Sequence, residues 1–107
     1  MGSEADSKYD VEAALSFEED LTTAVEFMLK ASGANAAKRF LDRYAEMCLL
    51  LQVFPYHGSP VGADDLFWRE LRPFTAVYEI DAEAHRVLLL RLHYHSSNWR
   101  NELMDIH

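Results

Sequence analysis

The chain has 107 residues, half of them hydrophobic and 26% charged, which fits one globular domain with a single core. Its formal net charge of -8 repels phosphate backbones, so we do not expect direct nucleic-acid binding. The longest apolar stretch, residues 47–54, is far shorter than the roughly 20 residues of a membrane span, and the opening MGSEADSKYD lacks the apolar segment of a signal peptide. These features predict a cytoplasmic protein without a membrane partner.

The first third of the chain predicts a strand followed by a helix. Residues 1–8 are polar and predicted to be flexible, and one domain is predicted over residues 9–107. YDVEAAL, from Tyr9, alternates apolar and polar residues with the period of a half-buried strand. Ser16 stands three residues before Glu19, the spacing of a capping box, and this predicts a helix start. The expected buried stripe of this helix consists of Leu21, Ala24, Val25, Met28 and Leu29.

A second helix is predicted between Gly33, which ends the first, and Pro55, which cannot continue a helix. It should begin at Asn35 or a neighbouring residue. Cys48 is the only cysteine, so no internal disulfide can form, and it is expected to be a small buried thiol. The expected buried stripe is Ala37, Phe40, Leu41, Tyr44, Cys48 and Leu51.

The second half of the chain predicts strands. FPYHGSPVGADD, residues 54–65, is rich in Pro, Gly and Asp and is predicted to be a loop. LFWREL, FTAVYEI and RVLLLRLHY then predict a three-stranded antiparallel meander, and SNWRNELMDI predicts a short C-terminal helix. The expected fold is therefore α+β, with an N-terminal strand, a two-helix hairpin, the meander and the short helix, the helices covering one sheet face.

Candidate site residues gather at the end of the last predicted strand. Ideal alternation places Leu88, Leu90, Leu92 and Tyr94 on one face, expected to meet the helices, and Val87, Leu89, Arg91, His93 and His95 on the other. His93 and His95 form an H-x-H pair that could supply two zinc ligands, but no third ligand stands at a telling spacing, so no metal and no cofactor are predicted. Arg69 could share a face with Arg91 beside His93. In the alternative, Arg91 pairs with Glu79 or Glu70 across strands.

Several strings together resemble one protein family. They are the pair Asp20–Leu21, AAKRFL at 36–41, the turn residues Pro55, Gly58 and Pro60, Arg69 with Leu71, AVYEID at 76–81 and RLHYHSSNW at 91–99. In this order and spacing they resemble the RelE/ParE toxin superfamily of bacterial type II toxin–antitoxin modules, whose members are also called plasmid stabilisation proteins. The similarity is greatest to the ParE branch.

The resemblance implies a toxin that binds a host target such as DNA gyrase and is neutralised by a cognate antitoxin. The alternative is a ribosome-dependent mRNA endonuclease of the RelE branch, with Arg69, Arg91, His93 and His95 as candidate phosphate-binding or acid–base residues. Where RelE nucleases carry basic residues, however, this chain has Thr75 and Ser96 or Ser97, and no tyrosine follows Tyr94. An enzyme is therefore not the favoured interpretation. A third possibility is a non-toxic relic that binds only its partner.

The resemblance also implies where the antitoxin binds. Antitoxin segments of this family occupy a groove beside the helical pair, so Val25, Leu29 and Phe40 are the candidate partner contacts. An ordinary intramolecular core explains the same residues equally well. Because the chain carries -8, we expect the partner segment to be neutral or basic and rich in apolar anchors. The oligomeric state is not predicted.

Overall fold

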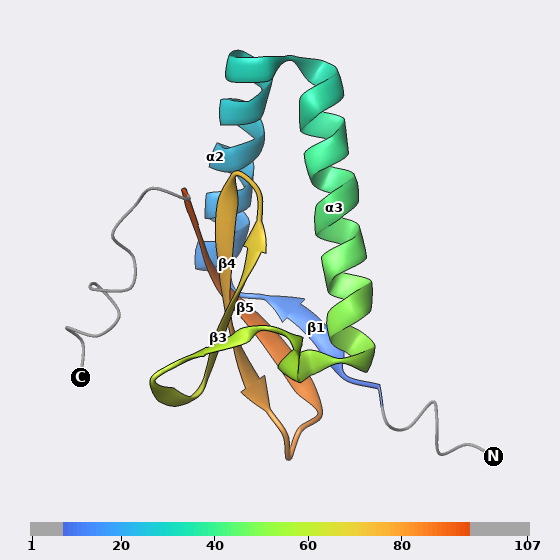
Figure 1. Cartoon of the computed structure of the whole chain (residues 1–107), viewed down its shortest axis with the longest axis vertical. Coiled ribbons are helices and arrows are strands. Elements are labelled where there is room, and N and C mark those ends of the chain that lie inside the picture. Colours follow the sequence, from blue (N-terminus) through green and yellow to red (C-terminus); the bar gives the residue numbers. More distant parts are fainter. Residues whose placement is uncertain (1–7, 95–107) are drawn as a thin grey trace.

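The structure is a computed structural model that describes residues 8–94, apart from the side chains of Ala63 and Asp64. A helical hairpin covers one face of a five-stranded sheet, which confirms the predicted α+β class (Figure 1). The predicted C-terminal helix lies outside the described residues. The elements in chain order are β1 (Asp10–Ala13), α2 (Leu15–Ser32), α3 (Ala34–Val53), the 3-10 turn η1 (Pro55–His57), β2 (Ser59–Val61), β3 (Ala63–Leu71), β4 (Phe74–Asp81) and β5 (Arg86–Tyr94).

The strand order is β1-β5-β4-β3-β2. The antiparallel β3-β4-β5 meander is confirmed, and β1 extends it by pairing parallel to β5, the last strand that the structure describes. The prediction of a continuous loop over residues 54–65 is wrong, because this stretch contains η1 and the short strand β2. A three-residue strand shows no periodicity, and its Pro60 is tolerated because β2 is an edge strand.

The start of α2 differs from the predicted capping box. The helix begins at Leu15 after Ala14, and no side chain caps its first turn. The Ser16 hydroxyl instead donates a hydrogen bond to the carbonyl of Leu90 on β5, at 2.7 Å. Ser16, the predicted capping residue, therefore makes a tertiary contact that fixes α2 to the sheet.

Gly33 forms the corner between the two helices. Its φ of 93° and ψ of 177° lie in a region that only glycine adopts readily. Its N–H donates to the carbonyls of Met28 and Leu29, and its own carbonyl accepts from Ala37 of the next helix. One residue thus ends α2 and begins α3.

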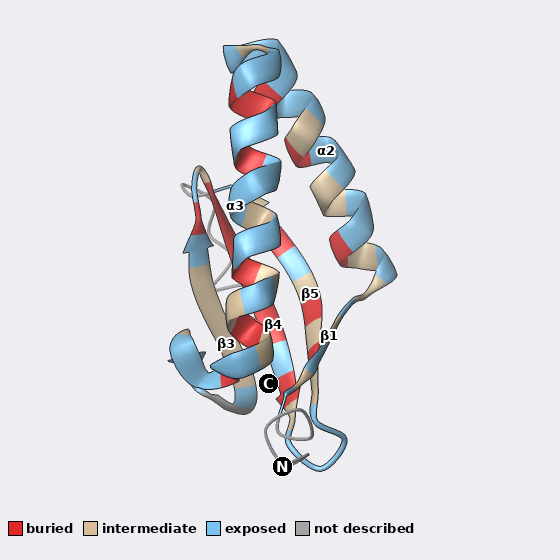
Figure 2. Cartoon of the chain, turned by 90° about the vertical axis from the view of Figure 1, so that its right-hand side faces the viewer, coloured by how far each residue is buried: buried red, intermediate tan, exposed pale blue. Residues whose placement is uncertain are grey.

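The core lies between the hairpin and the sheet, and the buried residues of both helices face it (Figure 2). Most of the predicted stripes are buried or half-buried, but Leu29 and Leu41 are exposed. The helical hairpin contributes Phe17, Ala24, Met28, Ala36, Ala37, Phe40, Met47 and Leu51, and the sheet contributes Leu71, Phe74, Ala76, Tyr78, Ile80, Val87, Leu89 and Leu92.

The predicted face alternation of β5 is only half correct. Val87 and Leu89 are buried in the core together with Leu92, whereas Leu88 and Leu90 are not part of it. The cause is a β-bulge: Tyr78 of β4 pairs with Leu89, but the preceding residue, Val77, pairs with Arg91. The extra residue reverses the alternation beyond it, so each half of the strand buries a different set of positions.

No helix among the described residues is long and apolar enough to span a membrane.

Candidate functional site

Arg91 and Asp20 form the contact that joins the end of β5 to α2. The Arg91 Nε donates to Asp20 Oδ2 at 2.7 Å, and the second guanidinium nitrogen reaches Oδ1 at 3.3 Å. The backbone N–H of Leu92 also donates to Oδ2, at 3.0 Å. Arg91 therefore pairs with Asp20 of α2, and not with Glu79 or Glu70 as predicted.

Arg69 and Arg91 do not share a sheet face, which corrects the polar patch predicted from the sequence. In the register of the sheet, Arg69, Ala76 and Leu92 form one row. Arg91 belongs to the adjacent row with Val77 and Trp68, and adjacent rows project to opposite faces. Without the bulge in β5, Arg91 would stand in the row of Arg69. The predicted convergence therefore fails because one inserted residue cannot be seen in the sequence pattern.

The predicted histidine pair is described only in part. His93 is half-buried and stands opposite Thr75 of β4, whereas His95 lies outside the described residues. Within residues 8–94, no group of three or more His, Cys, Asp or Glu side chains is arranged to hold a metal ion.

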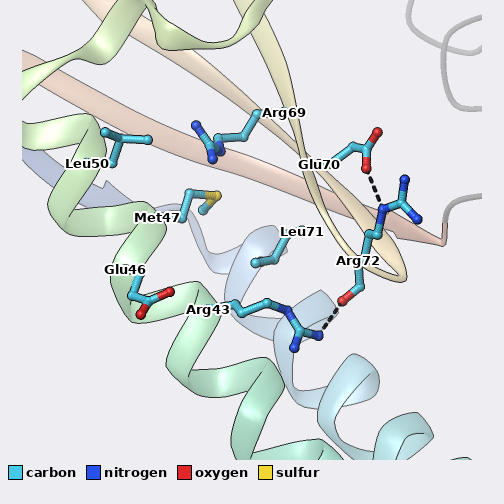
Figure 3. A pocket seen from close by; sticks show the side chains of 8 residues that line it. All are labelled: Arg43, Glu46, Met47, Leu50, Arg69, Glu70, Leu71 and Arg72. Atoms are coloured by element: carbon cyan, nitrogen blue, oxygen red, sulfur yellow. Dashed lines mark hydrogen bonds and ion pairs between the residues drawn. The ribbon is translucent and has the colours of Figure 1, made fainter.

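Arg69 lies in a groove between α3 and β3, which we call the α3–β3 groove (Figure 3). The groove has a volume of about 830 Å³. The Arg69 side chain points from β3 toward Met47 and Leu50 of α3, and Arg43 points from α3 toward Arg72 (Figure 3). The lining residues are Arg43, Glu46, Met47, Leu50, Arg69, Glu70, Leu71 and Arg72.

Two of these arginines are held by contacts across the rim of the groove. The Arg43 guanidinium donates to the backbone carbonyl of Arg72 at 2.8 Å, and Arg72 Nε pairs with Glu70 Oε2 at 2.7 Å. Arg72 therefore has a carboxylate partner, whereas Arg43 donates to a neutral carbonyl. The Arg43 guanidinium keeps donors that can turn toward a ligand.

The position of Arg69 depends on the turn at η1. One guanidinium nitrogen of Arg69 lies 2.6 Å from His57 Nδ1. Arginine has no acceptor, so Nδ1 accepts and the His57 proton is placed on Nε2. The Arg69 Nε is buried and makes no hydrogen bond within the part of the chain that the structure describes. A buried guanidinium nitrogen without an acceptor is energetically unfavourable and marks this side chain as incompletely paired.

Tyr78 holds the η1 turn on the sheet. Its hydroxyl donates to the Pro55 carbonyl at 2.9 Å and accepts from the Gly58 N–H at 3.0 Å. Burial raises the pKa of Tyr78, against the opposing effects of the Gly58 N–H and Arg69, so the hydroxyl keeps its proton and can donate. Through this contact, the central strand β4 fixes His57 beside Arg69. Tyr78 is therefore a buried support of the groove.

The three predicted partner contacts have different exposures. Leu29 is 47% exposed near the end of α2, Val25 is half-buried against the core, and Phe40 has no exposed surface. Of the three, only Leu29 is an exposed residue. Binding at this face of the hairpin remains a prediction that depends on Leu29.

A second, smaller hollow lies between α2 and the end of β5, with a volume of about 320 Å³. Phe27 and Tyr94 form part of its wall, and their rings meet edge to face at 5.3 Å. Sequence reasoning did not identify Phe27 here or Arg43 and Arg72 in the α3–β3 groove. Arginines at positions 43, 69 and 72 carry no common spacing, so only the folded topology reveals that they meet.

Comparison with known proteins places the chain among toxins of one type. The model of the ParE toxin of type II toxin–antitoxin systems matches residues 11–99. The chromosomal ParDE structure from P. aeruginosa is similar with a TM-score of 0.69 and 16% identity, covering 82% of this chain and 97% of that one. No curated protein sequence matches the chain.

Two further solved structures share the fold. The RelBE2 toxin–antitoxin complex from Mycobacterium tuberculosis has a TM-score of 0.61 and 21% identity, over 84% of this chain and 94% of that chain. The isolated E. coli RelE toxin has a TM-score of 0.55 and 14% identity, over 92% and 97%. At these identities, the structural similarities establish the fold alone.

Proposed function

Because the chain belongs to the ParE toxin family of type II toxin–antitoxin systems, we propose that it is a toxin that acts by binding a host protein and is neutralised by a cognate antitoxin. The proposed target is DNA gyrase, as the family resemblance implies. The observation that supports binding instead of catalysis is that two of the candidate catalytic residues lie far apart in their orientation. Arg69 and Arg91 project to opposite faces of the sheet, and Arg91 is paired with Asp20.

This separation favours a binding protein over the alternative RNA-cleaving enzyme. General acid–base catalysis needs two groups within hydrogen-bonding reach of the same reacting atoms. Arg69 contacts His57 in the α3–β3 groove, whereas Arg91 contacts Asp20 at the edge of β5. Arg69 and Arg91 therefore lie at separate sites, which supports a binding role over catalysis by this pair. The net charge of -8 also works against docking on ribosomal RNA.

The test is inducible expression in a bacterial host without a second gene from the same module. We expect growth arrest with induction of the DNA-damage response, and inhibition of gyrase-catalysed supercoiling by the purified chain. The control is the same gene with an early stop codon, which produces the transcript but no folded protein. Co-expression of the neighbouring gene should restore growth if that gene encodes the antitoxin.

Two outcomes would contradict the proposal and identify the alternatives. New 5′ ends within translated codons, mapped by primer extension after induction, would indicate a ribosome-dependent endonuclease. Unchanged growth at protein levels confirmed by immunoblot would indicate a non-toxic chain that retains only partner binding.

A further inference from the structure

The α3–β3 groove brings together two arginines that make no ion pair among the described residues, in an otherwise acidic chain. On β5, Arg86 lies 3.6 Å from Asp81 and Arg91 lies 2.7 Å from Asp20. Arg43 and Arg69, in contrast, have no carboxylate within 4.0 Å over residues 8–94. Two arginines that make no ion pair within residues 8–94 thus face the same groove, which Glu46 and Glu70 also line, and each retains N–H donors.

The groove also has an apolar floor. Met47 of α3 and Leu71 of β3 are buried core residues that line its base, and Leu50 is half-buried beside them. An apolar floor below two guanidinium groups suits a ligand that carries an aliphatic side chain and a nearby carboxylate. Arginine can bind a carboxylate through two parallel N–H donors, which gives such a ligand a defined orientation.

We propose that the α3–β3 groove binds an acidic segment of a protein partner, with Arg43 and Arg69 receiving its carboxylates and the floor receiving an apolar side chain. The proposal deepens the proposed function, because it rests on the chain acting by binding proteins. It replaces the neutral or basic partner segment expected from net charge alone. Local charge at the contact, and not the sum over the molecule, decides which groups bind directly.

A peptide fits this groove better than a nucleic acid. A nucleic acid carries a charge at every phosphate, so the net charge of -8 disfavours it more than a peptide with one or two carboxylates. A volume of about 830 Å³ is that of a pocket for a few side chains. A phosphodiester backbone would also leave the apolar floor without a partner.

The test begins with selection of displayed random dodecapeptides on the full chain. We expect the selected peptides to combine Asp or Glu with Leu, Ile or Met. The tightest peptide is then synthesised with a fluorescent label and measured by anisotropy, beside a version in which Gln and Asn replace its Glu and Asp. The neutral version should bind about tenfold more weakly, because it loses charge-assisted hydrogen bonds.

Variants locate the binding site. Arg43 is exposed, so Arg43→Gln should remain folded and reduce affinity for the acidic peptide about tenfold. The matched control is Lys30→Gln, which removes one positive charge from the exposed last turn of α2 and should leave affinity unchanged. Arg69→Gln should have the same effect as Arg43→Gln, provided that its circular dichroism spectrum matches the parent.

Three results would overturn the proposal: selection of neutral or basic peptides or of none, equal affinity of the parent and folded Arg43→Gln, or stronger competition by a DNA or RNA dodecamer than by unlabelled peptide. The growth assay distinguishes failure of the proposed groove from failure of the proposed toxicity. Growth arrest without peptide binding would refute the groove alone, and peptide binding without growth arrest would refute the proposed toxicity alone.

Discussion

The Tyr78 hydroxyl holds the η1 turn beside the α3–β3 groove, and a substitution of this one residue tests that role. It makes two hydrogen bonds in the interior, to the Pro55 carbonyl and from the Gly58 N–H. Tyr78→Phe leaves both groups without this partner and should lower the free energy of unfolding by about 1–3 kcal/mol in urea denaturation. Tyr94→Phe is the matched control, because Tyr94 is 45% exposed, and it should change stability by less than about 0.5 kcal/mol. Equal stabilities of the two variants would refute this role.

Gly58 packs closely against the Tyr78 hydroxyl and leaves no room for a side chain. A Cβ at this position would overlap the Tyr78 hydroxyl and lie 2.6 Å from the backbone carbonyl oxygen of Trp68. Gly58→Ala should therefore lower the free energy of unfolding by about 1–3 kcal/mol, since the carbonyl belongs to the sheet and cannot move freely. Ser59→Ala, at the exposed neighbouring position, is the control. A Gly58→Ala protein as stable as the parent would mean that the turn relaxes without cost.

The raised pKa of Tyr44 predicts how the stability of the protein changes at alkaline pH. Burial, with smaller contributions from Cys48 and Glu18, raises its pKa from 10.0 to about 12. Between these values the unfolded chain releases a proton that the folded chain keeps, so the free energy of unfolding should fall from about pH 10 to about pH 12. Tyr44→Phe should make this fall shallower in urea denaturation series across that range. A Tyr44→Phe slope equal to the parent's would contradict the prediction.

At the scale of elements, α2 completes the edge of β5 where β1 has ended. Asp20 accepts the Leu92 N–H at 3.0 Å, and Ser16, one turn earlier, donates to the Leu90 carbonyl. Asp20→Ala should lower the free energy of unfolding by about 1–3 kcal/mol and accelerate hydrogen exchange at the Leu92 amide. Asp20→Asn retains an acceptor and should cost less.

The control for the edge contact is Asp42→Ala, which removes an exposed carboxylate from α3. It should leave exchange at the Leu92 amide unchanged. Slow exchange at Leu92 in the Asp20→Ala protein would show that another group protects this edge.

The elements themselves were largely predictable, and their local exceptions were not. Hydrophobic periodicity identified both helices and the meander, because each buries one face over many residues. The bulge at Leu90, which moves Arg91 out of the row of Arg69, leaves no trace in alternation. Ser16 matched a local capping pattern, but its hydroxyl bonds to a strand far away in the sequence. The α3–β3 groove was missed for the same reason, since long-range pairing creates it.

For the whole molecule, two electrostatic effects on an acidic partner act over different distances. The net charge of -8 repels such a partner from afar, whereas Arg43 and Arg69 attract its carboxylates only at contact. Salt separates these effects, because the screening length falls from about 30 Å at 0.01 M to about 8 Å at 0.15 M. Long-range repulsion is thereby screened before close, partly desolvated pairs are weakened.

The rates of binding should reveal this separation. When the selected acidic peptide is mixed with the full chain in a stopped-flow anisotropy experiment, its association rate should rise about threefold between 10 and 150 mM NaCl as repulsion is screened. Its dissociation rate should change less, because the guanidinium–carboxylate contacts lie in the groove. The Gln and Asn version of the peptide lacks these carboxylates, so its association rate should vary less with salt. An association rate of the acidic peptide that falls with salt would mean that the groove's arginines dominate the field even at a distance.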